Sequence, residues 1–220
     1  MNILEAIRTR HSVRKYKDEP IAAELVEKLN ALIEEANRES GLHMQLILDD
    51  PQCFDTLLNH YGWFANANNY IAIAGPKDMD DLQESAGYYG QKIVLEAHMM
   101  GLRTCWVAGT YSKGKCSASL ASNEKIVCVI AIGYGQNDGV AHRSKPLKKL
   151  CSVPENEMPD WFRIGVEAAL QAPTAVNQQK FRISLENGKA VIRAGRGAMA
   201  TIDLGIVKYN FEAASGHKCD

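Results

Sequence analysis

The chain has 220 residues, a formal net charge of −1 and a hydrophobic fraction of 46%. This length fits one large domain or two small interlocked ones, and the apolar content is sufficient for a sizeable core. A charge near zero argues against a nucleic-acid-binding module, and no apolar run is long enough to span a bilayer.

The predicted elements begin with a short N-terminal helix, which Asn2 caps and Glu5 supports three residues later. The segment 10–16 is polar and alternating, and a second helix is predicted over 22–37. The apolar spacing then predicts, in chain order, strand 44–48, helix 53–60, strand 70–74, helix 80–100, strand 104–108 and strand 127–132. The strands 70–74 and 127–132 are apolar on both faces, which favours the middle of a covered sheet.

The rest of the chain begins with a polar, basic, proline-containing stretch, 140–159, which we interpret as a connector at the surface. After it, the pattern predicts a helix over 161–171, a hairpin and a last helix over 201–214. The hairpin strands, 181–185 and 190–193, flank an Asn-Gly turn. The order of elements indicates an α+β fold in which helices cover the sheet faces.

Six cysteines are scattered without a C-x-x-C pair, and no histidine cluster has metal-ligand spacing, so we expect no metal site. Cys105 and Cys128 lie in apolar runs and are interpreted as core residues. The first residues carry an early acid and no apolar stretch of the signal-peptide type. We therefore expect a cytoplasmic protein with reduced thiols.

A faint internal repeat relates two parts of the chain. The stretch 29–50 resembles 165–187, and the helix 90–101 resembles 205–216 with the same Gly-to-Gly spacing. Two explanations stay open. Amphipathic helices resemble one another by chance, or a duplication makes one chain imitate a two-fold dimer.

The first motif with chemical meaning lies in the segment 10–14. In an extended chain, residues two apart point the same way, so Arg10, Ser12 and Arg14 would direct two guanidinium groups and a hydroxyl at one spot. Such a donor set suits a phosphate. The alternative is an ordinary solvated basic turn.

The second motif follows a predicted helix end at Pro173. Thr174, Asn177 and Gln179 place a hydroxyl and two amides beside the start of a strand. These groups can pair with the polar edge of a flat heterocycle such as isoalloxazine. A polar helix-to-strand loop is the alternative.

Two further motifs are weaker. At 108–109 a strand ends in a glycine, so that the backbone can approach a ligand and offer an N–H to a flavin N5. Arg143 and Lys145 could add positive charge at a phosphate or at a flavin edge. A plain turn and a solvated linker are the respective alternatives.

Together these four motifs resemble the FMN-dependent nitroreductase family. The segment 10–14 resembles its R-x-S-x-R phosphate clamp, and 173–179 resembles its P-S-x-x-N-x-Q segment with Thr174 in place of serine. The helix 90–101 with its following strand, and 129–135 followed by Arg143, resemble the central helix and the terminal strand with its basic tail. The resemblance implies a nitroreductase-like fold with mainly antiparallel central sheets flanked by helices. It also implies FMN bound by Arg10, His11, Ser12, Arg14, Ala108, Gly109, Arg143, Lys145, Pro173, Thr174, Ala175, Asn177 and Gln179.

One departure from the family pattern is informative. In ordinary members the polar segment follows soon after the clamp, but here that place, 36–43, lacks the proline and the asparagine of the motif. Ordinary members are homodimers in which each flavin takes its clamp from one subunit and its polar segment from the other. The chain resembles a minor branch with two halves in one polypeptide. We therefore expect a pseudo-dimer with one FMN, a first half over 1–150 and a shorter second half over 151–220.

The resemblance implies a ping-pong NAD(P)H oxidoreductase. Hydride passes to the flavin N5, and a nitroaromatic or quinone acceptor then replaces the nicotinamide. Because the flavin carries this chemistry, no side chain is expected to be catalytic, and His11 is interpreted as structural or phosphate-facing. No G-x-G-x-x-G element follows a strand, which suits a nucleotide that visits and leaves.

Two other functions stay open, a flavin-binding sensor or store without steady turnover and an α+β interaction domain without flavin. The expected partner is a small-molecule electron acceptor, with no nucleic acid and no membrane. A monomeric pseudo-dimer is expected, and its further dimerisation is left open.

Overall fold

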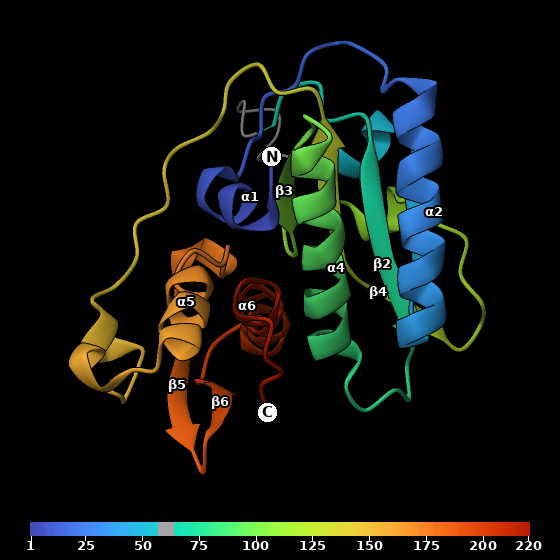
Figure 1. Ribbon diagram of the computed structural model, residues 1–220. Coiled ribbons are helices and arrows are strands. Elements are labelled where there is room, and N and C mark those ends of the chain that lie inside the picture. The colour runs from blue at the N-terminus through green and yellow to red at the C-terminus, as the bar shows by residue number, and fades with distance from the viewer. Residues whose placement is uncertain (57–63) are drawn as a thin grey trace. The chain divides into compact units, whose positions relative to one another are not determined.

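The computed structural model of the chain describes residues 1–56 and 64–220 (Figure 1). The chain forms two compact units that interleave along the sequence. Unit 1 comprises Met1–Thr9, Gln83–Leu95 and Ala141–Asp220, and unit 2 comprises Arg10–Leu82 and Glu96–Val140. The predicted halves, 1–150 and 151–220, are instead contiguous in sequence, and they stay a prediction.

Unit 2 is built on a four-stranded antiparallel sheet in the order β1-β2-β4-β3. Its strands are β1 (His43–Ile47), β2 (Tyr70–Pro76), β3 (Arg103–Val107) and β4 (Glu124–Gly133). The two strands that the sequence predicted as apolar on both faces, β2 and β4, are the two central strands, which confirms that interpretation. Cys105 and Cys128 are both buried in this sheet, as predicted.

Helix α2 (Ala23–Ser40) packs on this sheet beside β1 (Figure 1). Its buried side chains Leu29, Ile33 and Ala36 recur at helical spacing. Helix α2 ends at Gly41, whose φ of 74° is left-handed. The Asn37 side chain donates to the Met44 carbonyl at 2.9 Å and accepts from the Met44 amide at 2.7 Å, so it fixes the start of β1.

The predicted helix over 53–60 is a single short turn where the structure describes it. The 3-10 helix η1 covers Pro51–Phe54, with proline at its start, and residues 55 and 56 are not helical. The remaining residues of that prediction, 57–60, lie outside the described residues. A second short turn, η2, covers Lys113–Lys115.

Unit 1 combines helices with a two-stranded hairpin. Its elements are α1 (Ile3–Thr9), the larger part of α4 (Leu82–Met99), α5 (Asp160–Ala169), β5 (Phe181–Glu186), β6 (Lys189–Ala194) and α6 (Ala200–Ser215). The Asn2 side chain accepts a hydrogen bond from the Glu5 amide at 2.9 Å, which confirms the predicted cap. Both residues of the hairpin turn, Asn187 and Gly188, have positive φ, as a tight two-residue turn requires.

Helices α4 and α6 approach each other through two glycines. A Cβ atom built on Gly87 would lie 2.0 Å from the Ile202 carbonyl oxygen, and one on Gly205 would lie 2.0 Å from the Glu84 carbonyl oxygen. Ile202 precedes Gly205 by three residues, and Glu84 precedes Gly87 by three residues. The two helices therefore make equivalent contacts with each other, as in a two-fold symmetric pair. This contact pairs Gly87 with Gly205, whereas the repeat in the sequence aligned Gly90 with Gly205.

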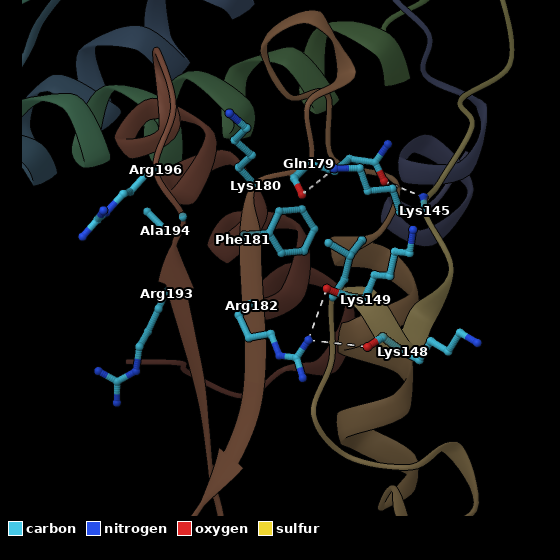
Figure 2. A pocket seen from close by; sticks show the side chains of 12 residues that line it. Lys145, Lys148, Lys149, Gln179, Lys180, Phe181, Arg182, Arg193, Ala194 and Arg196 are labelled. Carbon is cyan, nitrogen blue, oxygen red and sulfur yellow. Dashed lines mark hydrogen bonds between the residues drawn. The ribbon is translucent and has the colours of Figure 1, made fainter.

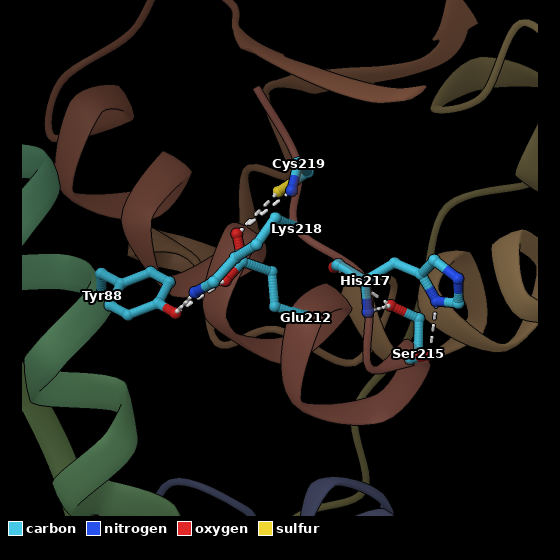
Figure 3. A network of polar contacts seen from close by, with 6 residues as sticks. All are labelled: Tyr88, Glu212, Ser215, His217, Lys218 and Cys219. Atoms are coloured by element: carbon cyan, nitrogen blue, oxygen red, sulfur yellow. Dashed lines mark hydrogen bonds and ion pairs between the residues drawn. The ribbon is translucent and has the colours of Figure 1, made fainter. Parts of the chain in front are cut away.

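The C-terminal tail is tied to unit 1 by Glu212 on α6 (Figure 3). The Glu212 carboxylate accepts hydrogen bonds from the Tyr88 hydroxyl at 2.7 Å, the Lys218 ammonium at 2.6 Å and the Cys219 amide at 3.2 Å. These bonds outweigh the burial of the group and lower the pKa of Glu212. Asp220 then continues beside β6, where its carbonyl accepts from the Ile192 amide at 2.8 Å.

The predicted connector over 140–159 is largely exposed and holds two single 3-10 turns, η3 (Leu147–Lys149) and η4 (Glu155–Glu157). All six cysteines are free thiols. In the described part of the chain, no helix has both the length and the hydropathy that crossing a bilayer requires.

Candidate functional site

The segment 10–16, which we call the clamp segment, runs alongside β3 in unit 2. Ser12 forms a parallel bridge with Thr104, and the Val13 amide donates to the Thr104 carbonyl at 3.0 Å. The clamp segment is therefore extended here, as predicted. Buried Tyr16 anchors its far end, since its hydroxyl donates to the Val13 carbonyl at 2.7 Å.

The three predicted clamp side chains all act on one buried thiol, that of Cys105. Burial raises the pKa of the Cys105 thiol, while the charges of Arg14 and Arg10 and a hydrogen bond with the Ser12 side chain oppose that rise. All three side chains therefore lie close to the Cys105 thiol on β3. Arg10 is buried, whereas Arg14 is exposed to solvent.

Buried polar atoms near the clamp segment have no protein partner. Within residues 1–56 and 64–220, Arg10 Nη1, His11 Nδ1 and Thr104 Oγ1 are buried without a hydrogen bond. The Arg10 side chain is only 4% exposed, and burial lowers its pKa to about 10. Buried polar groups are almost always paired, so these atoms are available to an external partner. An unpaired guanidinium nitrogen beside a hydroxyl fits an anion.

The surroundings of the clamp segment are basic. Burial and the charges of Arg103, Arg10 and His11 lower the pKa of His98 to about 4, so this imidazole stays neutral at pH 7. Asp138, whose charge raises the pKa of His98, is held by Arg103 through hydrogen bonds of 2.7 and 3.0 Å. Arg10, with a pKa of about 10, stays positively charged at pH 7, and no carboxylate among the described residues pairs with it.

The third predicted motif lies directly after β3. Ala108 and Gly109 follow the last strand residue, Val107, and Gly109 is exposed. A Cβ atom on Gly109 would meet nothing within 4 Å, so the space beside this backbone is open. Its role at a flavin stays a prediction.

The second motif, Pro173–Gln179, forms a strained loop in unit 1, which we call the polar segment. It contains the short turn η5 (Ala175–Asn177). Val176, Asn177 and Gln179 have φ angles of 45°, 53° and 45°, in the left-handed region that β-branched residues avoid. Val176 is 97% exposed. Such strain clusters at functional sites.

The polar segment binds the connector residues of the fourth motif. The Gln179 Oε1 accepts from the Lys145 amide at 2.7 Å, and its Nε2 donates to the Arg143 carbonyl at 2.9 Å. Asn177 Nδ2 donates to the same carbonyl at 3.0 Å. Thr174 Oγ1 accepts from the Gln179 amide at 3.0 Å. The structure thus brings the second and fourth motifs together, with the predicted amides engaged by the backbone of the connector.

A buried acid on α6 supports the other side of the polar segment. The Asp203 carboxylate accepts from the Ala175 amide at 2.8 Å and from the Gln178 side chain at 2.7 Å. Burial raises the pKa of Asp203, although both hydrogen bonds oppose the rise. Asp203 therefore holds the strained loop in place.

Replacing Asp203 by alanine is expected to loosen the polar segment and to destabilise the protein by about 1–3 kcal/mol, because the half-buried Ala175 amide loses its acceptor and the Gln178 side chain loses one of two acceptors. Hydrogen exchange at the amides of 175–179 measures the loosening, and denaturant unfolding measures the stability. Asp18→Ala, on an exposed position of unit 2, is the matched control. Unchanged exchange at the Ala175 amide would contradict the role given to Asp203.

Sequence reasoning missed four contributors to these clusters. Thr104 and His98 approach the clamp segment, and Asp203 and Gln178 hold the polar segment. Gln178 lies inside the second motif but was not among its predicted ligands, and the other three lie outside the four motifs. Only the folded chain places them there, although the predicted strand 104–108 already contained Thr104.

Comparison with known proteins assigns the chain to a family. Residues 2–215 match the family described as "Putative TM nitroreductase". The chain belongs to this family. The resemblance seen in the sequence is thereby confirmed at the level of the family.

Solved structures of nitroreductases share the fold. A putative nitroreductase from Thermotoga maritima is 23% identical, with a TM-score of 0.73 over 97% of this chain and 83% of that one. A putative nitroreductase in complex with FMN from Desulfovibrio desulfuricans is 23% identical, with a TM-score of 0.53 over 71% and 98%. An FMN-dependent nitroreductase from Clostridium difficile is 22% identical, with a TM-score of 0.52 over 63% and 90%. Curated proteins give no match.

These likenesses confirm an α+β nitroreductase-like fold with an antiparallel sheet flanked by helices. The order of elements along the chain bears on the predicted pseudo-dimer. The order helix, strand, strand, helix occurs twice, as α2-β1-β2-α4 and as α5-β5-β6-α6, with an antiparallel strand pair each time. This order and the reciprocal glycine contact support duplication in this chain, which stays a proposal.

Proposed function

We propose that this nitroreductase-family chain is an FMN-dependent NAD(P)H oxidoreductase that reduces nitroaromatic or quinone-type acceptors. Bound FMN would supply the two-electron chemistry, receiving hydride at N5 from NAD(P)H and passing it on in a ping-pong cycle. The chain itself binds and orients the cofactor.

The observation that carries the proposal is the buried, unpaired guanidinium nitrogen of Arg10. A buried cation without a partner costs stability, and an anionic ligand removes that cost. Ser12, Arg14 and Thr104 add further donors around it. The phosphate of FMN is the anion we propose here, because the clamp segment resembles the phosphate clamp of the family.

The polar segment is proposed to border the flavin ring. Its amides bind the connector backbone, so their contribution is to fix the shape of the loop. The loop presents the exposed Val176 side chain, an apolar surface that suits the face or edge of an aromatic ring. The proposed stoichiometry is one FMN per chain.

The test is the colour and chemistry of the purified protein. A yellow protein with one FMN per chain is expected, bleached by NAD(P)H under anaerobic conditions and restored by a quinone or a nitroaromatic. A yellow protein that NAD(P)H does not bleach would instead be a flavin sensor or store. A colourless protein that binds no added FMN would contradict the proposal.

Asn177→Ala removes hydrogen bonds that shape the polar segment and is expected to weaken FMN binding by about 1 kcal/mol or to shift the flavin potential. Fluorescence titration with FMN and a redox titration measure the two effects. Asn30→Ala, on the exposed face of α2, is the matched control. If Asn177→Ala changes neither quantity, the polar segment does not border the flavin.

A further inference from the structure

A groove in unit 1 collects positive charge. It has a volume of about 630 Å³ and lies between the connector and the β5–β6 hairpin (Figure 2). Seven of its twelve lining residues are lysine or arginine, and none is aspartate or glutamate. The whole chain has a net charge of only −1, so this concentration is local.

Most of this charge has no acid beside it. Lys148, Lys149, Lys180 and Arg196 make no side-chain hydrogen bond or ion pair with any residue in the ranges that the structure describes. Arg182 binds only the carbonyls of Lys148 and Lys149, at 3.5 and 3.3 Å. Arg193 alone has an acidic partner among the described residues, Glu186 outside the groove lining, at 3.2 Å.

The arrangement costs stability in the absence of an anion. Arg182 and Arg193 lie directly opposite each other in the register of the hairpin, and like charges in that position repel. Across the groove, Lys148 and Lys149 form a second basic wall (Figure 2). Two walls of one sign focus a field that attracts a multiply charged anion.

The groove continues into the polar segment. Gln179 lines the groove, and its amide also contacts Asn177 at 2.8 Å and the Lys145 backbone at 2.7 Å. A ligand with phosphates in the groove would therefore have its other end beside the loop proposed to border the flavin. The volume is in the usual range for small-molecule sites, about 300–1,000 Å³.

We propose that this groove binds the phosphates of the pyridine nucleotide and selects NADPH over NADH. The inference rests on the proposed function. The two basic walls take the pyrophosphate and the additional 2′-phosphate, which the lysines and Arg196 contact as charged donors. The phosphate clamp of Arg10 is a different set of residues in unit 2.

The first experiment measures binding without flavin chemistry. Calorimetry with 2′,5′-ADP and with 5′-AMP as probes is expected to show about tenfold tighter binding of 2′,5′-ADP, as one charge-assisted phosphate contact gives. The double variant Lys148→Glu/Lys149→Glu is expected to lose about tenfold or more in affinity for 2′,5′-ADP. Arg38→Glu/Lys125→Glu, which changes the net charge equally at exposed sites of unit 2, is the control.

The second experiment compares the nucleotides in turnover. The groove variant is expected to raise the KM for NADPH more than the KM for NADH, and more than it changes kcat. Circular dichroism and thermal unfolding verify that both double variants are folded. Where the groove variant does not fold, Arg196→Gln provides the same comparison with a smaller expected effect.

The outcomes separate this inference from the proposed function. If the protein binds FMN and oxidises NADPH but the groove variant behaves like the control, the groove assignment is overturned and the proposed function stands. If 2′,5′-ADP binds in the groove but the protein neither binds FMN nor oxidises NADPH, the proposed function is overturned. The proposal that the groove binds NADPH as a reductant is then overturned as well. The groove assignment is also overturned if both double variants lose affinity for 2′,5′-ADP equally. The same holds if the protein binds an oligonucleotide tightly but does not bind 2′,5′-ADP.

Discussion

Replacing Arg10 by methionine is expected to weaken FMN binding by about 1–3 kcal/mol, because a charge-assisted contact to the phosphate is lost. The same change is expected to leave the FMN-free protein as stable as before, or more stable. The reason is that Arg10 is 4% exposed with an unpaired Nη1 among the described residues, so methionine removes an uncompensated buried charge. Loss of a ligand-binding arginine weakens FMN binding without lowering the stability of the FMN-free protein. Loss of a structural arginine lowers that stability.

Fluorescence titration with FMN and thermal unfolding with and without FMN measure both quantities. Arg8→Met is the control, since Arg8 is an exposed arginine two residues earlier. An unchanged dissociation constant for FMN in Arg10→Met, or a large loss of stability of the FMN-free protein, would contradict the clamp.

Gly205→Ala is expected to destabilise the protein by about 3 kcal/mol or more, the upper range for overpacking a tight interior contact. Alanine normally favours a helix over glycine by about 1 kcal/mol, so the sign of the change is itself informative. The added Cβ would lie 2.0 Å from the Glu84 carbonyl oxygen and 2.6 Å from the Tyr88 amide nitrogen. Backbone atoms cannot rotate away, so helices α4 and α6 must separate.

Denaturant unfolding at 25 °C measures this loss. Gly114→Ala is the control, because a Cβ there would meet nothing within 4 Å. Gly87→Ala is expected to match Gly205→Ala, since its Cβ would lie 2.0 Å from the Ile202 carbonyl oxygen. A stabilised Gly205→Ala protein would show that the two helices are not in backbone contact in solution.

Most elements were predictable because their signals are local. The apolar runs of β2 and β4, the Asn-Gly turn and the Asn2 cap each act within a few residues, and the structure has each of them. The predicted helix over 53–60 was wrong in its described part, because the proline at 51 starts a single 3-10 turn that ends at Phe54.

The composition of the site was harder to predict because its contacts join distant residues. The clamp motif predicted that Arg10, Ser12 and Arg14 point to one spot, but their common effect on the Cys105 thiol depends on the pairing of Ser12 with Thr104. The basic groove escaped notice for the same reason. Its charges come from the connector, from both hairpin strands and from the turn before α6, and no single window of sequence contains them.

The interleaving of the two units has a consequence for biosynthesis. Unit 1 needs both Met1–Thr9 and the last eighty residues, so its first helix leaves the ribosome long before its packing partners exist. Long sequence separation between contacting segments slows folding and prolongs exposure of apolar surface. The nascent N-terminal helix must therefore stay solvated until residues 141–220 have been synthesised, and a chain that lacks those residues cannot assemble unit 1.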